Sequence, residues 1–314
     1  MLKKIILAVI CALMGGVFVF SAYTKLYPVE PFEFTFVELG LSWQMAPFIA
    51  RFLIGFELLI GVLLILNIQL KKITYKLGII TLLIFCIYLL LQIVIAGNTG
   101  NCGCFGTTIQ MTPLQALLKN IGMLIVFLGL YKLHDGWNYG KASKFIIIGL
   151  FLTSLILPFI LNPVKLDYSE AYLSAPEKNF KIPLDTLYDN ALVNTPPQEL
   201  RKGKYIISFM SLTCKHCRIA AKKIHIINQK NPNIPFYCVL NGKPEDLKGF
   251  FDDTQISNLP YCMLKGSHFI YLAGLSWPAI YLMNNSVVEN KVNYIILDQT
   301  EIEKWLDKPT LLPL

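Results

Sequence analysis

The sequence predicts a multi-domain chain in which an all-α helical membrane bundle precedes an α/β domain. Hydrophobic residues make up 54% of the 314 residues and charged residues only 15%, against roughly 25% charged residues in an ordinary soluble domain. The shortage of charge is uneven, since residues 1–162 hold 11 of the 28 Lys and Arg and 5 of the 20 Asp and Glu. We therefore expect the first half in a lipid bilayer and the second half in water.

Five apolar runs each approach the roughly 20 residues that cross the hydrocarbon of a bilayer. They cover residues 5–22, 46–66, 77–96, about 113–131 and 145–161. The first run is longer than the core of a signal peptide and lacks a small-x-small cleavage site, so we expect a retained helix. Before the fourth run, Thr112 and Pro113 are typical of a helix N-cap and its first position.

Basic residues orient these spans, because Lys and Arg concentrate in short cytoplasmic loops. One side carries eight lysines, and the short loops of the other side carry Lys25 alone. The N-terminus is then cytoplasmic, and the loop 97–112 and all residues after 162 are extracytoplasmic, in an oxidising compartment. The apolar spans and the extracytoplasmic cysteines predict the lipid bilayer and extracytoplasmic proteins with cysteines as partners. Because the basic residues form no continuous patch, we expect no nucleic-acid partner. The eight lysines are Lys3, Lys4, Lys71, Lys72, Lys76, Lys132, Lys141 and Lys144.

A Cys-x-x-Cys motif, Cys214 to Cys217, dominates the second half. The apolar run 205–210 before it is typical of a buried strand, and the stretch 218–229 after it is typical of a helix packed on a sheet. At a helix N-terminus, free N–H groups and the helix dipole favour a thiolate. Cys214 is then the attacking sulfur, Cys217 resolves, and His216 adds nearby positive charge, which favours an oxidising or isomerising couple.

Further strands are expected over 234–240 and 279–283, the latter turning into a fourth, with helices over 244–251 and 300–307. This order around the motif resembles the thioredoxin fold over residues 170–314, and by that resemblance Pro278 is the cis-proline facing the active disulfide. Thr213 and Trp277 depart from the pattern, which leaves substrate choice open. The alternatives are a zinc knuckle or a structural disulfide, for which only isolated partners exist, namely Cys238, Cys262, His225 and His268. We predict no metal site.

A second cysteine pair, Cys102 and Cys104, lies in the glycine-rich loop between the third and fourth spans. Cysteines separated by one residue close a small, strained ring, and strained, exposed disulfides are readily reduced. With the second span, which contains Arg51 and Glu57, this Cys-Gly-Cys-Phe-Gly loop resembles the methylamine-utilisation protein MauE family, related to DoxX-like membrane proteins. The resemblance covers residues 1–135 and implies a thiol-redox role in maturing a disulfide-rich periplasmic dehydrogenase, of which this sequence itself gives no sign.

The predicted domains are therefore a four-helix membrane domain (1–135), a fifth membrane helix (136–162), a tether (163–175) and a thioredoxin-like domain (176–314). Within the membrane, Glu57 falls near mid-bilayer, where an ionisable group indicates function or a neutral, hydrogen-bonded carboxyl. Arg51 is expected to extend toward the surface. Lys119 either does the same or stabilises a thiolate in the cysteine loop. Cys11 and Cys86 are expected to be packing residues.

The leading hypothesis is a membrane thiol-disulfide oxidoreductase in which Cys214 and Cys217 exchange disulfides with client proteins and with Cys102 and Cys104. The sequence shows no bound cofactor. By analogy with vitamin K epoxide reductases fused to a thioredoxin domain, a membrane quinone is a candidate electron acceptor. The alternatives are a non-catalytic, MauE-like assembly or maturation factor that binds a client through the thioredoxin fold, and a small-molecule transporter centred on Glu57.

Overall fold

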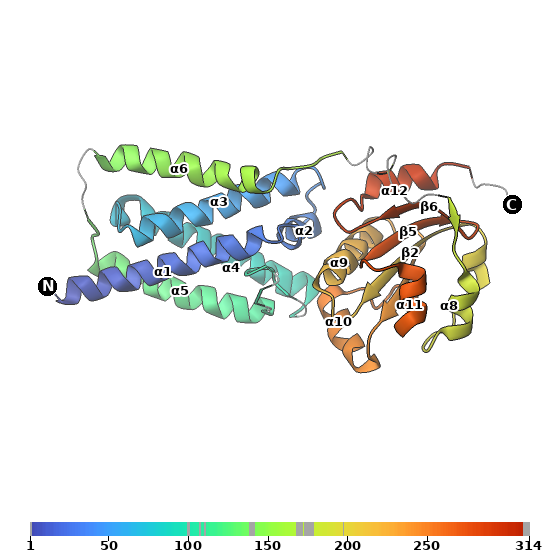
Figure 1. The fold of residues 1–314 in the computed structure, drawn as a ribbon. Helices are drawn as coiled ribbons and strands as arrows, with labels where there is room; N and C mark the ends of the chain where they lie inside the picture. The colour runs from blue at the N-terminus through green and yellow to red at the C-terminus, as the bar shows by residue number, and fades with distance from the viewer. Residues whose placement is uncertain are drawn as a thin grey trace. The chain divides into compact units, whose positions relative to one another are not determined.

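The computed structural model describes residues 2–98, 101–106, 108–109, 111–137, 142–167, 172, 179–196 and 198–309. The described chain divides into two compact units, residues 1–164 and 165–314 (Figure 1). Most of the predicted tether, together with Lys141, Pro176 and Pro197, lies outside the described residues.

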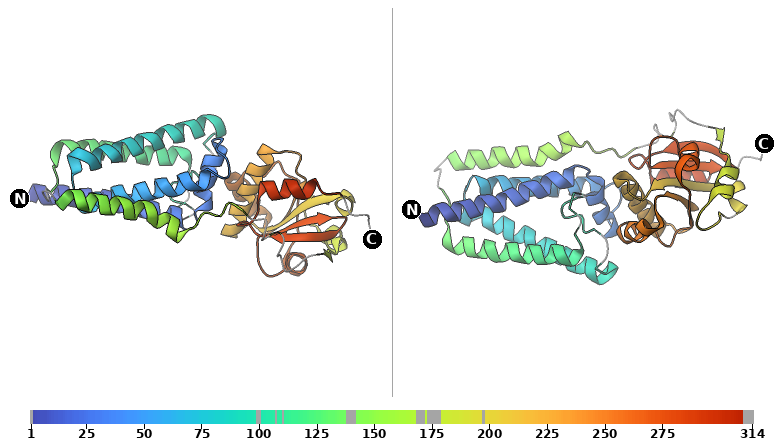
Figure 2. Two further views of the ribbon diagram at one scale, coloured as in Figure 1. Left: turned by 90° about the horizontal axis from the view of Figure 1, so that it is seen from above. Right: turned by 60° about the horizontal axis from the view of Figure 1, so that its bottom comes forward.

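The first unit is a helical bundle. Five of its helices are long and apolar enough to cross a membrane: α1 (Leu2–Leu26), α3 (Ala46–Ile65), α4 (Tyr75–Ala96) with the π-helical turn η1 (Leu70–Thr74) before it, α5 (Pro113–Leu133) and α6 (Ala142–Leu161). They run alongside one another (Figure 2). The chain is thus a multi-pass membrane protein, as the apolar runs predict. Thr112 and Gln115 form a reciprocal capping box at the start of α5, so the predicted N-cap is confirmed.

Close helix packing in the bundle depends on small residues, as expected where lipid provides no hydrophobic drive. A Cβ atom on Gly15 of α1 would lie 2.5 Å from the carbonyl oxygen of Gly61 on α3. A Cβ on Gly55 would come equally close to the carbonyl oxygen of Ser154 on α6. The backbone of α3 therefore touches two neighbouring helices.

One helix of this unit was not predicted, α2 (Glu30–Glu38), which follows α1. Its nine residues are too few for a transmembrane signal. Phe32, Phe34 and Val37 are buried, so α2 packs against the bundle. The expectation that Lys25 lies in a loop was wrong, because α1 extends to Leu26 and buries this lysine in its last turn.

The second unit is a six-stranded sheet with the order β1-β6-β5-β2-β3-β4. The strands β2, β3 and β4 are parallel, and β5 and β6 are antiparallel to their neighbours. Their bounds are β1 (Phe180–Lys181), β2 (Lys204–Ser211), β3 (Phe236–Asn241), β4 (Tyr261–Met263), β5 (Ala279–Asn284) and β6 (Val287–Val292). This is a thioredoxin-like arrangement, with β2 leading directly into the Cys-x-x-Cys helix.

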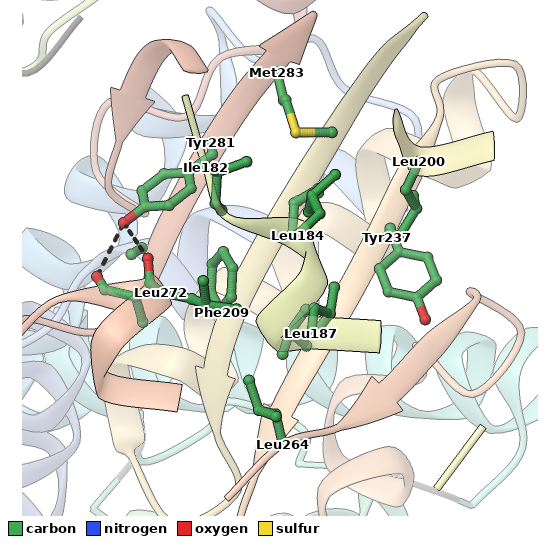
Figure 3. Close-up of a cluster of buried hydrophobic side chains, with 14 of the residues drawn as sticks. Ile182, Leu184, Leu187, Leu200, Phe209, Tyr237, Leu264, Leu272, Tyr281 and Met283 are labelled. Carbon is green, nitrogen blue, oxygen red and sulfur yellow. Dashed lines mark hydrogen bonds between the residues drawn. The ribbon is translucent and has the colours of Figure 1, made fainter. Parts of the chain in front are cut away.

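Helices cover both faces of the sheet (Figure 1). The helices are α8 (Leu184–Asn190), α9 (Lys215–Lys230), α10 (Leu247–Thr254), α11 (Gly266–Ala273) and α12 (Gln299–Leu306), with short 3-10 turns at η2 (Gln198–Arg201) and η3 (Pro244–Asp246). Figure 3 shows the core beneath α8 and α11, where Phe209 of β2 lies among Leu187, Leu272 and Tyr281. The Tyr281 hydroxyl donates to the Leu272 carbonyl at 3.0 Å, which ties α11 to β5.

Candidate functional site: two cysteine pairs

Cys214 lies where β2 has ended and α9 begins. It is the N-cap residue of α9, with an extended backbone (φ −81°, ψ 122°), and its Sγ accepts a hydrogen bond from the Cys217 N–H at 3.4 Å. Cysteine here takes the place of the usual Ser, Thr or Asp cap. The sulfur is therefore held against the positive end of a 16-residue helix.

The two sulfurs of this motif differ sharply in environment. Cys217 is fully buried, and its Sγ accepts from the Ser211 N–H at 3.3 Å. Cys214 is partly exposed. The pKa of Cys214 falls to about 6, because the Cys217 thiol donates to its sulfur and the Cys217 and His216 N–H groups add to this despite partial burial. The same contact and burial raise the pKa of Cys217. Cys214 is thus a thiolate at neutral pH and Cys217 a thiol.

The residues between and after the cysteines play unequal parts. The exposed His216 ring stacks on Tyr294, with centroids 5.3 Å apart, and its charge makes a small contribution to the low pKa of Cys214. Arg218 faces the neighbouring helix, where it pairs with Asp253 and donates to the Leu212 carbonyl at 3.0 Å. Arg218 therefore fixes the start of α9 rather than the sulfurs.

Pro278 precedes β5 at the same end of the sheet. The register pairs Phe209 with Ala279, so the residues before Ala279 and those after Phe209 meet at the edge where the Cys214 turn begins. The Trp277–Pro278 peptide bond is cis. The Trp277 indole N–H donates to the Gly274 carbonyl at 3.0 Å, and its ring contacts Phe269.

Cys102 of the second cysteine pair is buried, contrary to the expectation of an exposed loop, whereas Cys104 is partly exposed. Cys102 is 2% exposed, and it packs with Cys86, Leu89 and Ala116. Its N–H donates to the Met111 carbonyl at 2.9 Å. The Asn101 amide donates to the Gly106 carbonyl at 2.8 Å. Because these bonds satisfy the backbone internally, the loop can fold back into the bundle.

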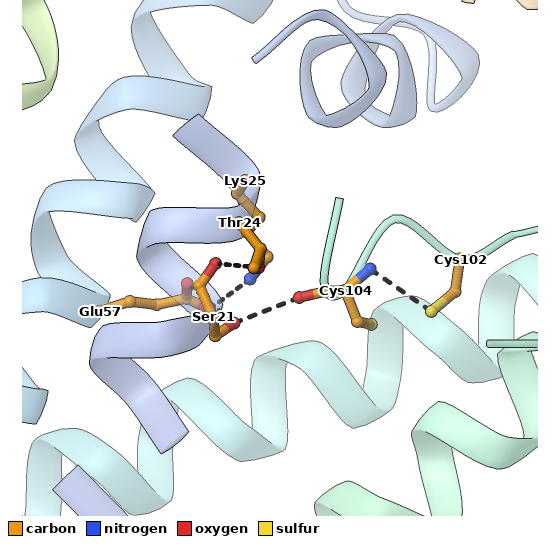
Figure 4. Close-up of polar contacts among 6 residues, drawn as sticks. All are labelled: Ser21, Thr24, Lys25, Glu57, Cys102 and Cys104. Atoms are coloured by element: carbon orange, nitrogen blue, oxygen red, sulfur yellow. Dashed lines mark hydrogen bonds and ion pairs between the residues drawn. The ribbon is translucent and has the colours of Figure 1, made fainter. Parts of the chain in front are cut away.

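Gly106 makes this folding back possible. Its φ is +56°, and a Cβ atom here would lie 2.1 Å from the Thr24 carbonyl oxygen of α1. Only glycine fits such a close approach of two backbones. On the same side, the Ser21 hydroxyl of α1 donates to the Cys104 carbonyl at 3.2 Å, as Figure 4 shows.

Cys104 resembles Cys214 in its acidity. The Cys104 N–H donates to the Cys102 sulfur at 3.4 Å. A hydrogen bond from the Cys102 thiol lowers the pKa of Cys104 to about 7, and the charges of Lys25 and Lys119 contribute against the opposing effect of burial. The Lys119 ammonium lies 4.3 Å from the centroid of the Phe105 ring. Of the two positions expected for Lys119, at the bilayer surface or beside the cysteine loop, the structure shows the one beside the loop.

Glu57 forms a buried ion pair that the sequence did not predict. Its Oε1 lies 2.5 Å from Lys25 Nζ, and both side chains are 3% exposed. The Ser21 hydroxyl also lies 3.3 Å from Glu57 Oε2, and it shares its one hydrogen between this carboxylate and the Cys104 carbonyl, so it links the ion pair to the Cys104 loop (Figure 4). The sequence feature that could have indicated this ion pair was Lys25, the one basic residue that the sequence analysis assigned to the two short loops on the extracytoplasmic side.

Arg51 was expected to extend toward the surface, but its side chain is buried, at 4% exposure. It pairs with Glu33 of α2 at 2.5 Å and donates to the Asn162 carbonyl at the end of α6 at 2.6 Å. Its partners are supplied by segments far apart in the sequence, so a single-helix argument could not find them. Arg51 thus joins α2, α3 and α6.

The remaining cysteines are buried: Cys11, Cys86, Cys238 and Cys262. Cys262 pairs in register with Val239, and Cys238 with Tyr261. Among the described residues, no group of three or more His, Cys, Asp or Glu side chains is placed to hold a metal ion.

The fold and its motifs define a class: a multi-pass membrane protein with a cysteine-bearing helical domain and a thioredoxin-like domain. Residues 3–133 match the family model for methylamine utilisation protein MauE. The chain is 28% identical to Protein TlpB of Flavobacterium psychrophilum, in an alignment covering 90% of this chain and 92% of that protein. The predicted likeness of the membrane domain to MauE is thereby confirmed.

Two solved structures are similar to part of this chain. The thioredoxin domain of a thiol-disulfide oxidoreductase from Bacteroides vulgatus is 14% identical, with a TM-score of 0.33, covering 42% of this chain and 99% of that one. A secreted disulfide oxidoreductase of Mycobacterium tuberculosis is 15% identical, with a TM-score of 0.31, covering 39% and 96%.

Proposed function

We propose that this protein is a membrane-bound thiol-disulfide oxidoreductase, in which Cys214 and Cys217 exchange disulfides with client proteins and with Cys102 and Cys104. One observation carries the proposal. Cys214 caps α9 as a partly exposed sulfur with a pKa of about 6, and its partner Cys217 is buried. An acidic, accessible thiolate beside a protonated partner is the arrangement that disulfide exchange requires.

The exchange proceeds in two balanced steps. In the reducing direction, the Cys214 thiolate attacks one sulfur of a client disulfide, and the other client sulfur leaves as a thiolate. Cys217 then loses its proton and attacks Cys214, which closes the Cys214–Cys217 disulfide and releases the reduced client. The client gains two electrons and the motif loses two. Oxidation of a client is the reverse sequence.

The topology supports transfer between the two pairs. With the lysine-rich loops in the cytoplasm, the N-terminus is cytoplasmic, and the Cys102 loop and the second unit are both extracytoplasmic. The covalent connection makes the exchange intramolecular, which raises the effective thiol concentration to roughly millimolar. The predicted tether, residues 163–175, would supply the reach.

A candidate client surface borders Pro278. Leu275 is 89% exposed and Tyr271 68% exposed, although both are large apolar side chains. They lie in α11 and the turn that leads to Trp277 and Pro278. Exposed apolar groups beside a reactive thiol would hold an unfolded or extended client segment during exchange.

A trapping experiment tests the proposal. In Cys217→Ser the resolving sulfur is absent, so full-length protein in native membranes should accumulate a mixed disulfide joining Cys214 to Cys102 or Cys104, identified by mass spectrometry of the linked peptides. Cys86→Ala, which removes a packing thiol, is the matched control and should accumulate none. Absence of the linked peptides in Cys217→Ser across reducing and oxidising conditions would overturn the internal exchange.

The second candidate is a non-catalytic assembly or maturation factor, supported by the match of residues 3–133 to MauE and by the exposed Leu275 and Tyr271. A double variant, Cys214→Ala with Cys217→Ala, separates the two functions. Loss of client disulfide exchange and of cellular function together supports the oxidoreductase. Retained cellular function supports the assembly factor.

A further inference from the structure

A cavity of about 160 Å³ lies inside the first unit, and both Cys102 and Cys104 line it. Its remaining walls are formed by α1 to α5 and are mainly aromatic and aliphatic, with Phe32, Phe85 and Met123 among them. An apolar cavity of about 150 Å³ is large enough to bind a six-membered aromatic ring. The cavity therefore has the volume for one ring of a ligand, in direct contact with a dithiol.

The wall of the cavity also carries charge. Lys25, Glu57 and Lys119 all line it, and the Lys25 ammonium lies 4.8 Å from the centroids of both the Phe32 and the Phe85 rings. Ammonium groups donate hydrogen bonds to ring oxygens and can supply protons. A ligand that accepts hydrogen bonds at its oxygens and carries an apolar ring would match both parts of this wall.

The cavity reaches the outer surface of the bundle. Ile84 of α4 and Leu39, at the end of α2, line it and are 54% and 42% exposed. Val17 of α1 lines it as well and is 36% exposed. Apolar side chains that are exposed on a transmembrane bundle face lipid, so a ligand would enter from the bilayer. A lipid-soluble molecule fits this route better than a water-soluble thiol.

The geometry points to a binding site for a lipid-soluble quinone in this cavity, with Cys102 and Cys104 as its electron donors. The inference rests on the proposed function and names the final acceptor of its electrons. In the net step Cys102 and Cys104 give up two electrons and two protons while the S–S bond forms, and the quinone leaves as the hydroquinone. Lys25 and Lys119 would bind the ring oxygens and pass protons to them.

The test uses full-length protein in lipid nanodiscs and an azido derivative of a short-chain ubiquinone, with a short-chain menaquinone as a second probe. We expect photolabelling to map to residues of α4, α5 or the Cys102 loop that line the cavity, and unlabelled quinone to compete. Labelling confined to other lipid-facing surfaces, or labelling that unlabelled quinone does not reduce, would overturn the site.

Two variants of α4 sharpen the test. Ile84→Trp should narrow the entrance and weaken photolabelling roughly tenfold or more, which corresponds to about 1.4 kcal/mol. Ile87→Trp is the control, because Ile87 is 58% exposed on the same helix and is not among the residues lining the cavity. Equal labelling of both variants would contradict the site.

A third measurement separates this inference from the proposed function. Once an added thiol oxidant such as diamide has closed the Cys102–Cys104 disulfide, the mixed disulfide with Cys214 should still form in Ile84→Trp combined with Cys217→Ser, because attack of the Cys214 thiolate on that disulfide does not pass through the entrance. A mixed disulfide without competable quinone labelling leaves the oxidoreductase standing and refutes the quinone site. Competable labelling that maps to the cavity but no mixed disulfide refutes the internal exchange alone.

Discussion

Cys214 and Cys104 are each the more acidic sulfur of a closely spaced pair, but different surroundings make them so. At Cys214, which is partly exposed, the Cys217 thiol and the N–H groups at the start of α9 together lower the pKa of the sulfur. At Cys104, which is also partly exposed, the charges of Lys25 and Lys119 act together with the Cys102 thiol to lower the pKa of the sulfur. The groups that stabilise the Cys214 thiolate are neighbours in the sequence, whereas those that stabilise the Cys104 thiolate come from α1, α5 and the cysteine loop.

This difference teaches how each pair is suited to its surroundings. Backbone N–H groups stabilise a thiolate wherever a helix begins, so the Cys214 site needs little help from the rest of the fold. In the bundle, a buried thiolate needs charged partners, and these need partners in turn. The Lys25–Glu57 ion pair and its Ser21 hydrogen bond meet that need for the membrane site.

The largest expected effect comes from breaking this ion pair. Lys25→Met leaves the Glu57 carboxylate buried without its cation, which should cost about 3–5 kcal/mol of folding free energy. It should also raise the pKa of Cys104. Thermal unfolding in detergent and the pH dependence of Cys104 alkylation measure the two effects.

A double variant, Lys25→Met with Glu57→Leu, is the matched control for this prediction. It should recover most of the stability, since no lone charge remains buried, and its Cys104 pKa should lie below that of Lys25→Met, because the Glu57 charge, which raises this pKa, is also removed. An unchanged pKa of Cys104 in the single variant Lys25→Met would show that Lys25 does not act on Cys104.

The next effect concerns the docking of the cysteine loop. Gly106→Ala places a Cβ 2.1 Å from the Thr24 carbonyl oxygen at a positive φ, and the strain should cost about 1–3 kcal/mol and expose Cys104 to faster alkylation. Gly122→Ala of α5, where a Cβ meets nothing within 4 Å, should leave both properties almost unchanged. If both variants alkylate at the wild-type rate, the loop does not depend on this close approach.

The difference between the two sites also predicts different pH midpoints for the alkylation of Cys214 and of Cys104. Because the thiolate reacts and the thiol does not, alkylation of Cys214 should be half-maximal near pH 6 and that of Cys104 near pH 7. Both values lie below the ordinary thiol pKa of about 8.5. The reduced second unit should therefore gain stability as pH rises from 6 toward 8.5, and lose it as pH falls through 6. Midpoints near 8.5 for both sulfurs would contradict the account.

The smallest effect is expected at His216. His216→Ala removes a charge that contributes little to the acidity of Cys214, so the alkylation midpoint should rise only slightly and the stacking on Tyr294 should be lost. A large rise would mean that His216, and not the start of α9, sets the acidity of Cys214.

Features encoded in short stretches were predictable from the sequence. The apolar runs gave the five long helices, and the strand-to-helix context of Cys214 gave its position at the N-terminus of α9. The short elements β1, β4, α8 and α11 carry too few residues for a periodic pattern. Contacts between distant segments, such as Lys25 with Glu57 and Arg51 with Glu33, were beyond single-helix arguments. The burial of Cys102 was missed because Asn101 supplies hydrogen bonds that composition does not reveal.

The central claim is that the two cysteine pairs form one redox chain. A time course of thiol alkylation tests it most directly, following reoxidation of Cys214 and Cys217 in native membranes after a pulse of reductant. The account predicts that Cys102→Ser with Cys104→Ser slows reoxidation roughly tenfold or more, because the millimolar effective concentration of the tethered pair is lost. Reoxidation at the wild-type rate in this variant would contradict it.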